Sequence, residues 1–158
     1  MIIKAEEGTA VVEFAIIAPL LFVILFGIIE FGVLLYDKAM ITNAAREGAR
    51  AGIVYDTNLR DEDGVIDTTA LSSQVQTSVN SYLGGNLISF VGTPSVTVPA
   101  PTVSEENGDG ILSSGDSLTV TVNFAYQFLV FSGVIDLIGG GSFGDSINLQ
   151  AVSVMRLE

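Results

Sequence analysis

The sequence has no cysteine and no histidine, and it also lacks tryptophan. These absences exclude disulfide bonds, zinc sites built from Cys and His, and catalysis by a nucleophile paired with histidine. Basic residues are scarce: the 158 residues include 6 Lys and Arg against 18 Asp and Glu, a formal net charge of −12. Such a charge repels nucleic acid, so no nucleic-acid partner is expected. Carboxylates are the only abundant reactive groups left, and we expect no enzymatic activity.

Charge is divided unevenly along the chain. Residues 1–54 carry 6 acidic and 4 basic residues, whereas residues 55–158 carry 12 acidic and 2 basic ones. High hydrophobicity and high net charge therefore belong to different parts of the protein. We expect a long hydrophobic helix over residues 9–54 and an acidic head domain over 55–158.

The N-terminal part contains a long apolar run. Residues 14–29, FAIIAPLLFVILFGII, include no charge, and the run resumes after Glu30 as far as Tyr36. As a helix, residues 14–36 would measure about 34 Å, against roughly 30 Å of bilayer hydrocarbon. A core helix of a soluble protein is one alternative, but the rest of the chain is too small to surround it. A cleaved secretory signal is another, although its apolar region would be only about 7 to 15 residues long. The run predicts a membrane span.

Small residues follow the apolar run at a helical spacing. Ala44, Gly48 and Gly52 recur every four residues, which leaves one face of the predicted helix almost without side-chain bulk. Glycine inside a helix costs up to about 1 kcal/mol relative to alanine, so helix propensity does not explain the pair. We therefore expect this face to pack closely against helices of neighbouring subunits.

Two carboxylates lie at or within the apolar run. Glu13 precedes it directly, and Glu30 interrupts it seven residues before Asp37. An ionised carboxylate in hydrocarbon must be paired, neutralised or moved to an interface. Glu13 can reach the interface, and Glu30 is expected to find a partner in an assembled bundle. The two are about 26 Å apart along a helix, too far for a catalytic pair.

The order of these features resembles a known family. Gly8 is followed after four residues by Glu13-Phe14, then by Pro19, the apolar run, Glu30-Phe31-Gly32 and the stretch NAAREGAR at 43–50. This order resembles the TadE-like family, the pilin-like proteins of tight-adherence (Tad/Flp) pilus systems, and the ending INLQAVSVMRLE is similar to that family's last strand.

The resemblance implies a processing and assembly pathway. Residues 1–8 would be a short leader that a prepilin peptidase removes by cutting between Gly8 and Thr9, which leaves Glu13 as the fifth residue of the mature chain. In pilins this glutamate neutralises the N-terminal amine of a neighbouring subunit, and Glu13 and Phe14 would lie at that contact. The implied partners are identical or homologous pilin subunits and the pilus assembly machinery. The chain would reside in the cytoplasmic membrane before assembly and then in an extracellular filament or at the cell surface.

The head has the periodicity of an α+β fold. Leu71, Val75, Val79 and Leu83 form a helical stripe within residues 70–83, which ends at two glycines. Residues 88–101, 117–131 and 146–157 read as three strands, the second with strict alternation of apolar and polar residues. We expect a small antiparallel sheet with one short helix, whose core is sufficient only if the long helix or a neighbouring subunit contributes.

One acidic segment has the spacing of a calcium loop. Glu105, Asn107 and Asp109 stand at alternate positions, Gly110 and Ile111 follow at positions six and seven, and Asp116 stands at position twelve. Side-chain oxygens at one, three and five, a turn glycine and a final carboxylate are the pattern of a twelve-residue calcium loop. The competing interpretation is a solvated hairpin loop, since Asn-Gly and Asp-Gly are common turn formers. Both remain open.

A second acidic segment, DTNLRDEDGVID at 56–67, offers a weaker calcium site. Its candidate ligands are Asp61, Asp63 and Asp67. Leu59 occupies the first ligand position and Arg60 lies inside the segment, so a solvated acidic loop is the favoured interpretation. Apart from possible calcium, no cofactor is expected.

Two functions of different classes follow from these features. The first is a structural, pilin-like subunit that assembles through its hydrophobic helix into an extracellular filament or its assembly base, with a role in cell adhesion. The second is a monomeric, single-pass membrane protein whose extracellular head binds calcium or another ligand.

Overall fold

The computed structural model describes residues 4–54, 65–106, 108, 115–131, 133–134 and 146–157. Within them the chain forms two helices and one antiparallel sheet, an α+β fold as expected. The elements are α1 (Lys4–Ile53), α2 (Thr68–Leu83), β1 (Ser95–Thr97), β2 (Thr102–Ser104), β3 (Ser117–Gln127) and β4 (Ser146–Arg156).

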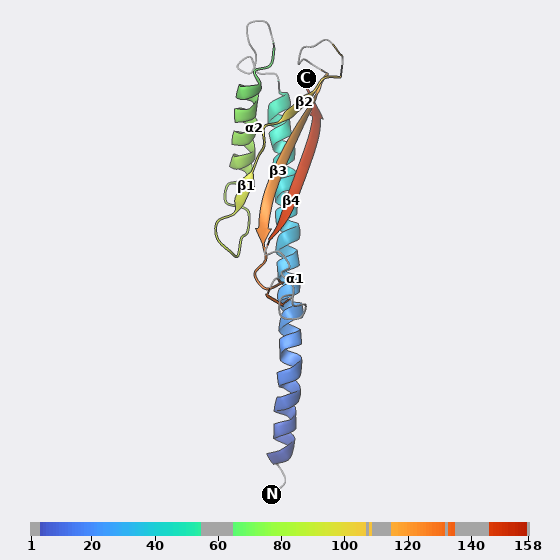
Figure 1. The fold of residues 1–158 in the computed structure, drawn as a ribbon, viewed down its shortest axis with the longest axis vertical. Helices are drawn as coiled ribbons and strands as arrows, with labels where there is room; N and C mark the ends of the chain where they lie inside the picture. The colour runs from blue at the N-terminus through green and yellow to red at the C-terminus, as the bar shows by residue number, and fades with distance from the viewer. Residues whose placement is uncertain are drawn as a thin grey trace.

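The molecule is elongated because α1 is far longer than the head that packs on it. Figure 1 shows α1 as a rod whose N-terminal half extends below the head and whose C-terminal half forms part of it. The helix is continuous through Pro19. Residues 11–17 are all exposed, whereas Ile41, Ala44 and Ala49 are fully buried. The N-terminal half of α1 therefore lies outside the head, and its C-terminal half forms part of the core of the head.

The sheet is organised around β3. One edge of β3 pairs with β4 along its whole length, from Ser117 opposite Arg156 to Gln127 opposite Ser146. The other edge pairs with β1 near residues 123–125 and with β2 near residues 117–119. All of these pairings are antiparallel. Each of them includes β3, so β3 is the central strand of the sheet.

The sheet has one more strand than the sequence predicted. The strand expected within residues 88–101, from the alternation between Pro94 and Pro99, is found at Ser95–Thr97, and a further short strand that was not expected follows at Thr102–Ser104. Pro99 and Pro101 lie between them, and proline has no N–H to donate to a strand partner. Four residues, 98–101, span a distance that β3 covers with three, 120–122, so this edge contains an extra residue, as at a bulge.

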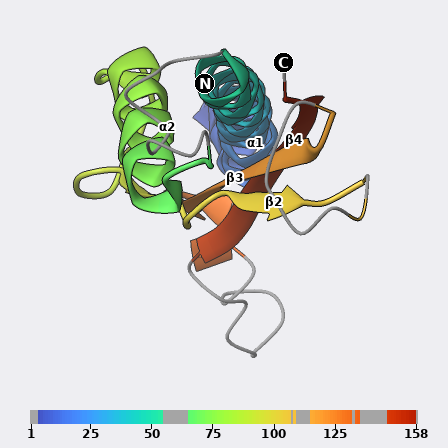
Figure 2. The same cartoon turned by 90° about the horizontal axis from the view of Figure 1, so that it is seen from above.

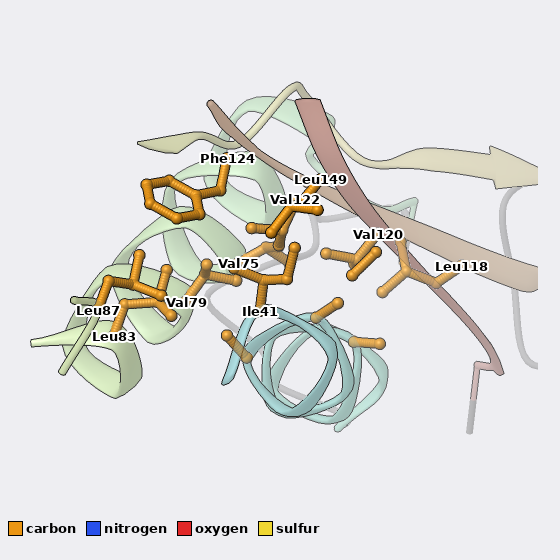
Figure 3. Close-up of a cluster of buried hydrophobic side chains, with 14 of the residues drawn as sticks. Ile41, Val75, Val79, Leu83, Leu87, Leu118, Val120, Val122, Phe124 and Leu149 are labelled. Carbon is orange, nitrogen blue, oxygen red and sulfur yellow. The ribbon is translucent and has the colours of Figure 1, made fainter. Parts of the chain in front are cut away.

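The core lies between the sheet and the two helices. Viewed from above, α1 and α2 lie side by side on one face of the sheet (Figure 2). Alternate residues of β3 are buried, and so is the predicted stripe of α2; Figure 3 shows Val75 and Val79 of α2, Ile41 of α1, and Val120 and Val122 of β3 in one cluster. The C-terminal part of α1 therefore completes the hydrophobic core of the head, so this contribution comes from the same chain and not from a neighbouring subunit.

Candidate assembly and membrane site

The lower part of α1 is an uncovered apolar surface. Among the described residues, Gly8–Ile53 is long and apolar enough to cross a membrane. Phe14 is 69% exposed, and the neighbouring aliphatic and aromatic side chains share this exposure. The exposed set includes Val11, Val12, Ile16, Ile17, Leu20, Leu21, Phe22, Ile24, Leu25, Phe26, Ile28 and Ile29. An apolar surface of this extent requires lipid or other apolar helices around it.

The residues of the expected processing and assembly site lie at the lower end of this rod. Gly8 and Thr9 are exposed in the first turns of α1. A Cβ added at Gly8 would meet no other heavy atom within 4 Å. Glu13 is exposed too, one turn above Thr9. The head leaves these residues accessible to a peptidase or to another subunit.

Glu30 has partners within its own chain. Its side chain is buried, with 4% exposure. Oε2 accepts the backbone N–H of Phe131 at 3.0 Å and that of Val130 at 3.4 Å, and Oε1 accepts the N–H of Leu129. The expectation that Glu30 needs a partner in an assembled bundle is corrected: these three amides belong to the segment after β3, which folds back onto α1.

Tyr126 strengthens the same junction. Its hydroxyl group donates to the main-chain carbonyl oxygen of Glu30 at 3.4 Å, in a buried position. Burial, followed by the negative charges of Glu30 and Asp37, raises the pKa of Tyr126 to about 12. The phenol therefore stays protonated and remains a donor at physiological pH.

Asp37 joins α1 to the segment after α2. Its side chain has 0% exposure, and Oδ1 accepts the backbone N–H of Ile88 at 3.0 Å. Oδ2 has no hydrogen-bond partner among the residues that the structure describes. Burial raises the pKa of Asp37, and the hydrogen bond from Ile88 opposes that shift only in part. Lys38, the next residue, donates instead to the main-chain oxygen of Gln150 in β4.

The small-residue face of α1 is used inside the chain, which corrects the expected role of Ala44, Gly48 and Gly52 in contacts between subunits. Ala44 is fully buried in the head core. A Cβ at Gly48 would lie 2.5 Å from Cγ2 of Val79, and one at Gly52 would lie 2.5 Å from Cδ2 of Leu118. Close packing does require these glycines, but α2 and β3 are what they approach. The sequence alone does not distinguish packing of this face against α2 and β3 of the same chain from packing against another subunit.

Of the predicted ligands of the first calcium loop, the structure describes the first and the last, Glu105 and Asp116. Asn107, Asp109 and Ile111 lie outside the described residues, and Glu105 is exposed. Asp116 is fully buried, and its Oδ1 accepts the backbone N–H of Glu106 at 2.9 Å. The carbonyl oxygen of Asp116 accepts the N–H of Leu157 at 2.7 Å, which joins the start of β3 to the end of β4. Calcium binding here stays a prediction.

The second predicted calcium segment is represented by one carboxylate. Asp61 and Asp63 lie outside the described residues, whereas Asp67 is the N-cap of α2. Its Oδ1 accepts the backbone N–H groups of Thr69 at 2.8 Å and Ala70 at 3.1 Å. A side-chain oxygen that satisfies the first free amides of a helix has a structural role. Within the described part of the chain, no group of three or more Asp, Glu, His or Cys side chains is placed to hold a metal ion.

The comparison with known protein families bears on α1. Residues 8–50 match the family described as TadE-like protein. The resemblance drawn from the order of Gly8, Glu13, Glu30 and NAAREGAR is therefore confirmed over this segment. No curated protein and no solved structure matches the chain. The TadE-like segment ends at residue 50, so it covers the exposed rod and the part of α1 that forms a wall of the head.

The partners of Glu30 and Asp37 could not be predicted from the sequence. Both residues stood out because they are charges next to apolar runs. Their partners are backbone amides of residues 88 and 129–131, and an amide has no sequence signature. Only the fold brings these segments to α1.

Proposed function

We propose that this chain is a pilin-like subunit that assembles through the lower part of α1 into a Tad-type pilus filament or its base. The family match and the apolar helix fit a pilus-associated membrane subunit. The observation that carries the further step is the exposure of the apolar side chains between Val11 and Ile29. Lipid can cover this surface in a membrane, and sister helices can cover it after extraction from the membrane.

Glu13 has a specific part in this proposal. It is an exposed carboxylate directly below the apolar surface. After cleavage between Gly8 and Thr9, an incoming subunit would bring a positively charged amine to the same level of the bundle. A charge-assisted contact of that amine with Glu13 would neutralise two groups that are costly in apolar surroundings. The prepilin peptidase and the assembly machinery are the partners that this pathway requires.

The absence of cysteine permits a direct test. In an Ile16→Cys variant the only thiol lies on the exposed apolar surface, since Ile16 is 73% exposed. Because each chain then carries one thiol, we expect oxidation of cells that export this variant to give a disulfide-linked dimer, and negative-stain images to show filaments. Adding Glu13→Gln should abolish both, while adding Glu47→Gln, a change of a carboxylate higher on α1, should leave both intact.

Two results would contradict the proposal. Filaments at the normal level from the Glu13→Gln variant would remove the role of Glu13. Monomers alone, from every variant and from the unmodified chain, would favour the single-pass membrane protein with a ligand-binding head. Intact-mass measurement of the exported chain tests the leader, because retention of residues 1–8 would exclude cleavage after Gly8.

A further inference from the structure

Among the residues that the structure describes, the end of the head that faces the exposed rod consists of apolar and uncharged residues. Two loops form this end, residues 88–91 after α2 and residues 128–131 after β3, and Figure 1 shows both at the lower margin of the head beside α1. Phe90 is 41% exposed and Leu129 is 52% exposed, and Ile88 and Val91 are exposed as well. No charged residue occurs between positions 68 and 104 or between 117 and 135 of a chain whose net charge is −12.

The acidic residues of the head that the structure describes lie at its other end. Asp67 caps the start of α2, and Glu106 and Asp116 adjoin the start of β3. In Figure 1 these elements begin at the top of the head, away from the N-terminus. The charged residues of the head that the structure describes are thus separated along the long axis from the loops next to the apolar rod.

The uncharged loops overlap in height with the apolar run of α1. Side chains from both meet around a hollow of about 110 Å³, lined by Phe26, Ile29, Glu30, Phe90, Leu129 and Val130. Hydrocarbon of roughly 30 Å corresponds to about 20 helical residues, so a span that starts at Phe14 reaches about Val33. Phe26 and Ile29 then lie in the leaflet on the head side. Phe90 and Leu129, which line the same hollow, lie at the same depth.

The backbone of the loop 128–131 has side-chain partners for three of its amides, and that of the loop 88–91 has partners for the N–H of Ile88 and the carbonyl oxygen of Val91, to which the Ser89 hydroxyl donates. An amide without a partner is costly in lipid because no water is there to bind it. Glu30 accepts the N–H groups of residues 129–131, and Asp37 accepts that of Ile88. Phe131 also packs edge-on against Phe31 of α1, with 5.6 Å between ring centroids, so the second loop is fixed to the helix.

We propose that the loops 88–91 and 128–131 enter the bilayer leaflet on the head side and form a second membrane contact next to α1. The head is then in contact with the membrane surface through these loops as well as through α1. The second contact restricts the tilt and rotation of the head before assembly. Apolar side chains at loop tips anchor proteins to the interface in this way, in proportion to the apolar area they bury. The proposal depends on membrane insertion of α1 and is independent of filament formation.

The chain has no tryptophan, so single-tryptophan variants report depth without background. The full chain is reconstituted in phosphatidylcholine vesicles at high dilution, with bromine atoms on the upper part of the acyl chains. We expect Phe90→Trp and Leu129→Trp to show blue-shifted emission, to lose most of it to the brominated lipid, and to resist iodide. The matched control is Val154→Trp, an apolar position with 61% exposure on β4, which should be quenched by iodide and unaffected by brominated lipid.

Two outcomes would overturn the proposal. If the emission of Phe90→Trp and Leu129→Trp behaves like that of Val154→Trp, the loops lie in water. If the blue shift appears only as the ratio of protein to lipid rises, a second copy of the chain covers the loops instead of lipid. Two independent positions guard against misfolding of one variant, and circular dichroism verifies the helix content of each.

Discussion

The backbone N–H of Phe131 donates to Oε2 of Glu30 at 3.0 Å, and the two residues are 101 positions apart in the sequence. Together with the hydrogen bonds from the amides of Leu129 and Val130, this bond joins the segment after β3 to the middle of α1. A carboxylate that looked like an isolated charge in an apolar helix is therefore the point at which the head is joined to its rod.

We expect Glu30→Gln to weaken this junction. Glutamine keeps one acceptor oxygen but directs an NH₂ group at the remaining amides, which leaves buried donors unsatisfied at a cost of about 1–3 kcal/mol. Hydrogen exchange of the amides of residues 129–131 should accelerate, as measured by mass spectrometry of the chain in detergent micelles. Glu13→Gln is the control, because Glu13 is exposed and remote from the head. Unchanged exchange in Glu30→Gln would show that the carboxylate is dispensable for the junction.

The glycines of α1 provide a test of packing inside the chain. Gly48→Ala puts a methyl group 2.5 Å from Cγ2 of Val79, a branched side chain on a helix that would have to shift. Overpacking of this kind costs about 1–3 kcal/mol, more than the gain of up to about 1 kcal/mol in helix propensity. Gly52→Ala should cost at least as much, because its Cβ would lie 2.5 Å from Cδ2 of the fully buried Leu118 and also 3.0 Å from Cγ2 of Val75.

The control for this series is Gly32→Ala, where an added Cβ meets nothing within 4 Å. It should leave the free energy of unfolding unchanged or raise it. Denaturant titration followed by circular dichroism measures all three variants. Should Gly48→Ala unfold like the unmodified chain yet fail to form filaments, the small-residue face would act between subunits after all.

Because Asp37 is buried, we expect its contribution to the stability of the folded chain to fall as the pH rises. Its pKa in the folded chain is raised above the ordinary value of 3.8, because burial disfavours the charged form. The folded state therefore binds this proton more tightly than the unfolded state. The contribution to stability is complete below pH 3.8 and is lost as the pH rises through the folded pKa.

Asp37→Asn tests this dependence, since asparagine imitates the protonated acid and keeps an oxygen for the N–H of Ile88. We expect the variant to be at least as stable as the unmodified chain at neutral pH and to lose the decline with rising pH. Glu47→Gln, at a partly exposed position of the same helix, is the matched control and should leave the pH profile unchanged. A lower stability of Asp37→Asn at neutral pH would mean that the buried charge is stabilised by its surroundings.

Asp67 distinguishes helix capping from calcium binding. Asparagine is as good an N-cap as aspartate, whereas alanine in that position costs about 1 kcal/mol. We therefore expect Asp67→Asn to melt like the unmodified chain and Asp67→Ala to melt at a lower temperature. If Asp67 also served as a calcium ligand, Asp67→Asn would be less stable than the unmodified chain in millimolar calcium and would match it in chelator.

The same melting experiment decides the predicted loop at 105–116. A ligand present at about 100 times its Kd adds about 2.7 kcal/mol to the stability of the folded state. Asp116 already accepts the N–H of Glu106, a bond that has to be shared or broken for calcium. A higher melting temperature in millimolar calcium than in chelator would establish the site, and equal temperatures would leave the solvated hairpin loop as the interpretation.

The sequence by itself determined the features that depend on neighbours along the chain. The apolar run and the family motif predicted the long helix, the spacing of Leu71 to Leu83 predicted α2, and alternation predicted β3 and β4. Helical and strand periodicities are local, so they can be read one segment at a time. The division of residues 88–104 into two short strands was missed, because the effect of the two prolines depends on which edge of β3 they meet.

Only the tertiary structure decided where the polar and small residues of α1 find their partners. Glu30 and Asp37 bind amides that lie 51 to 101 positions away, and Gly48 and Gly52 receive side chains of α2 and β3. A buried carboxylate requires donors and a glycine requires close neighbours, but neither requirement specifies whether they come from the same chain or from another. Folding of the head onto α1 settles that choice, because it brings the segments after α2 and after β3 to the helix.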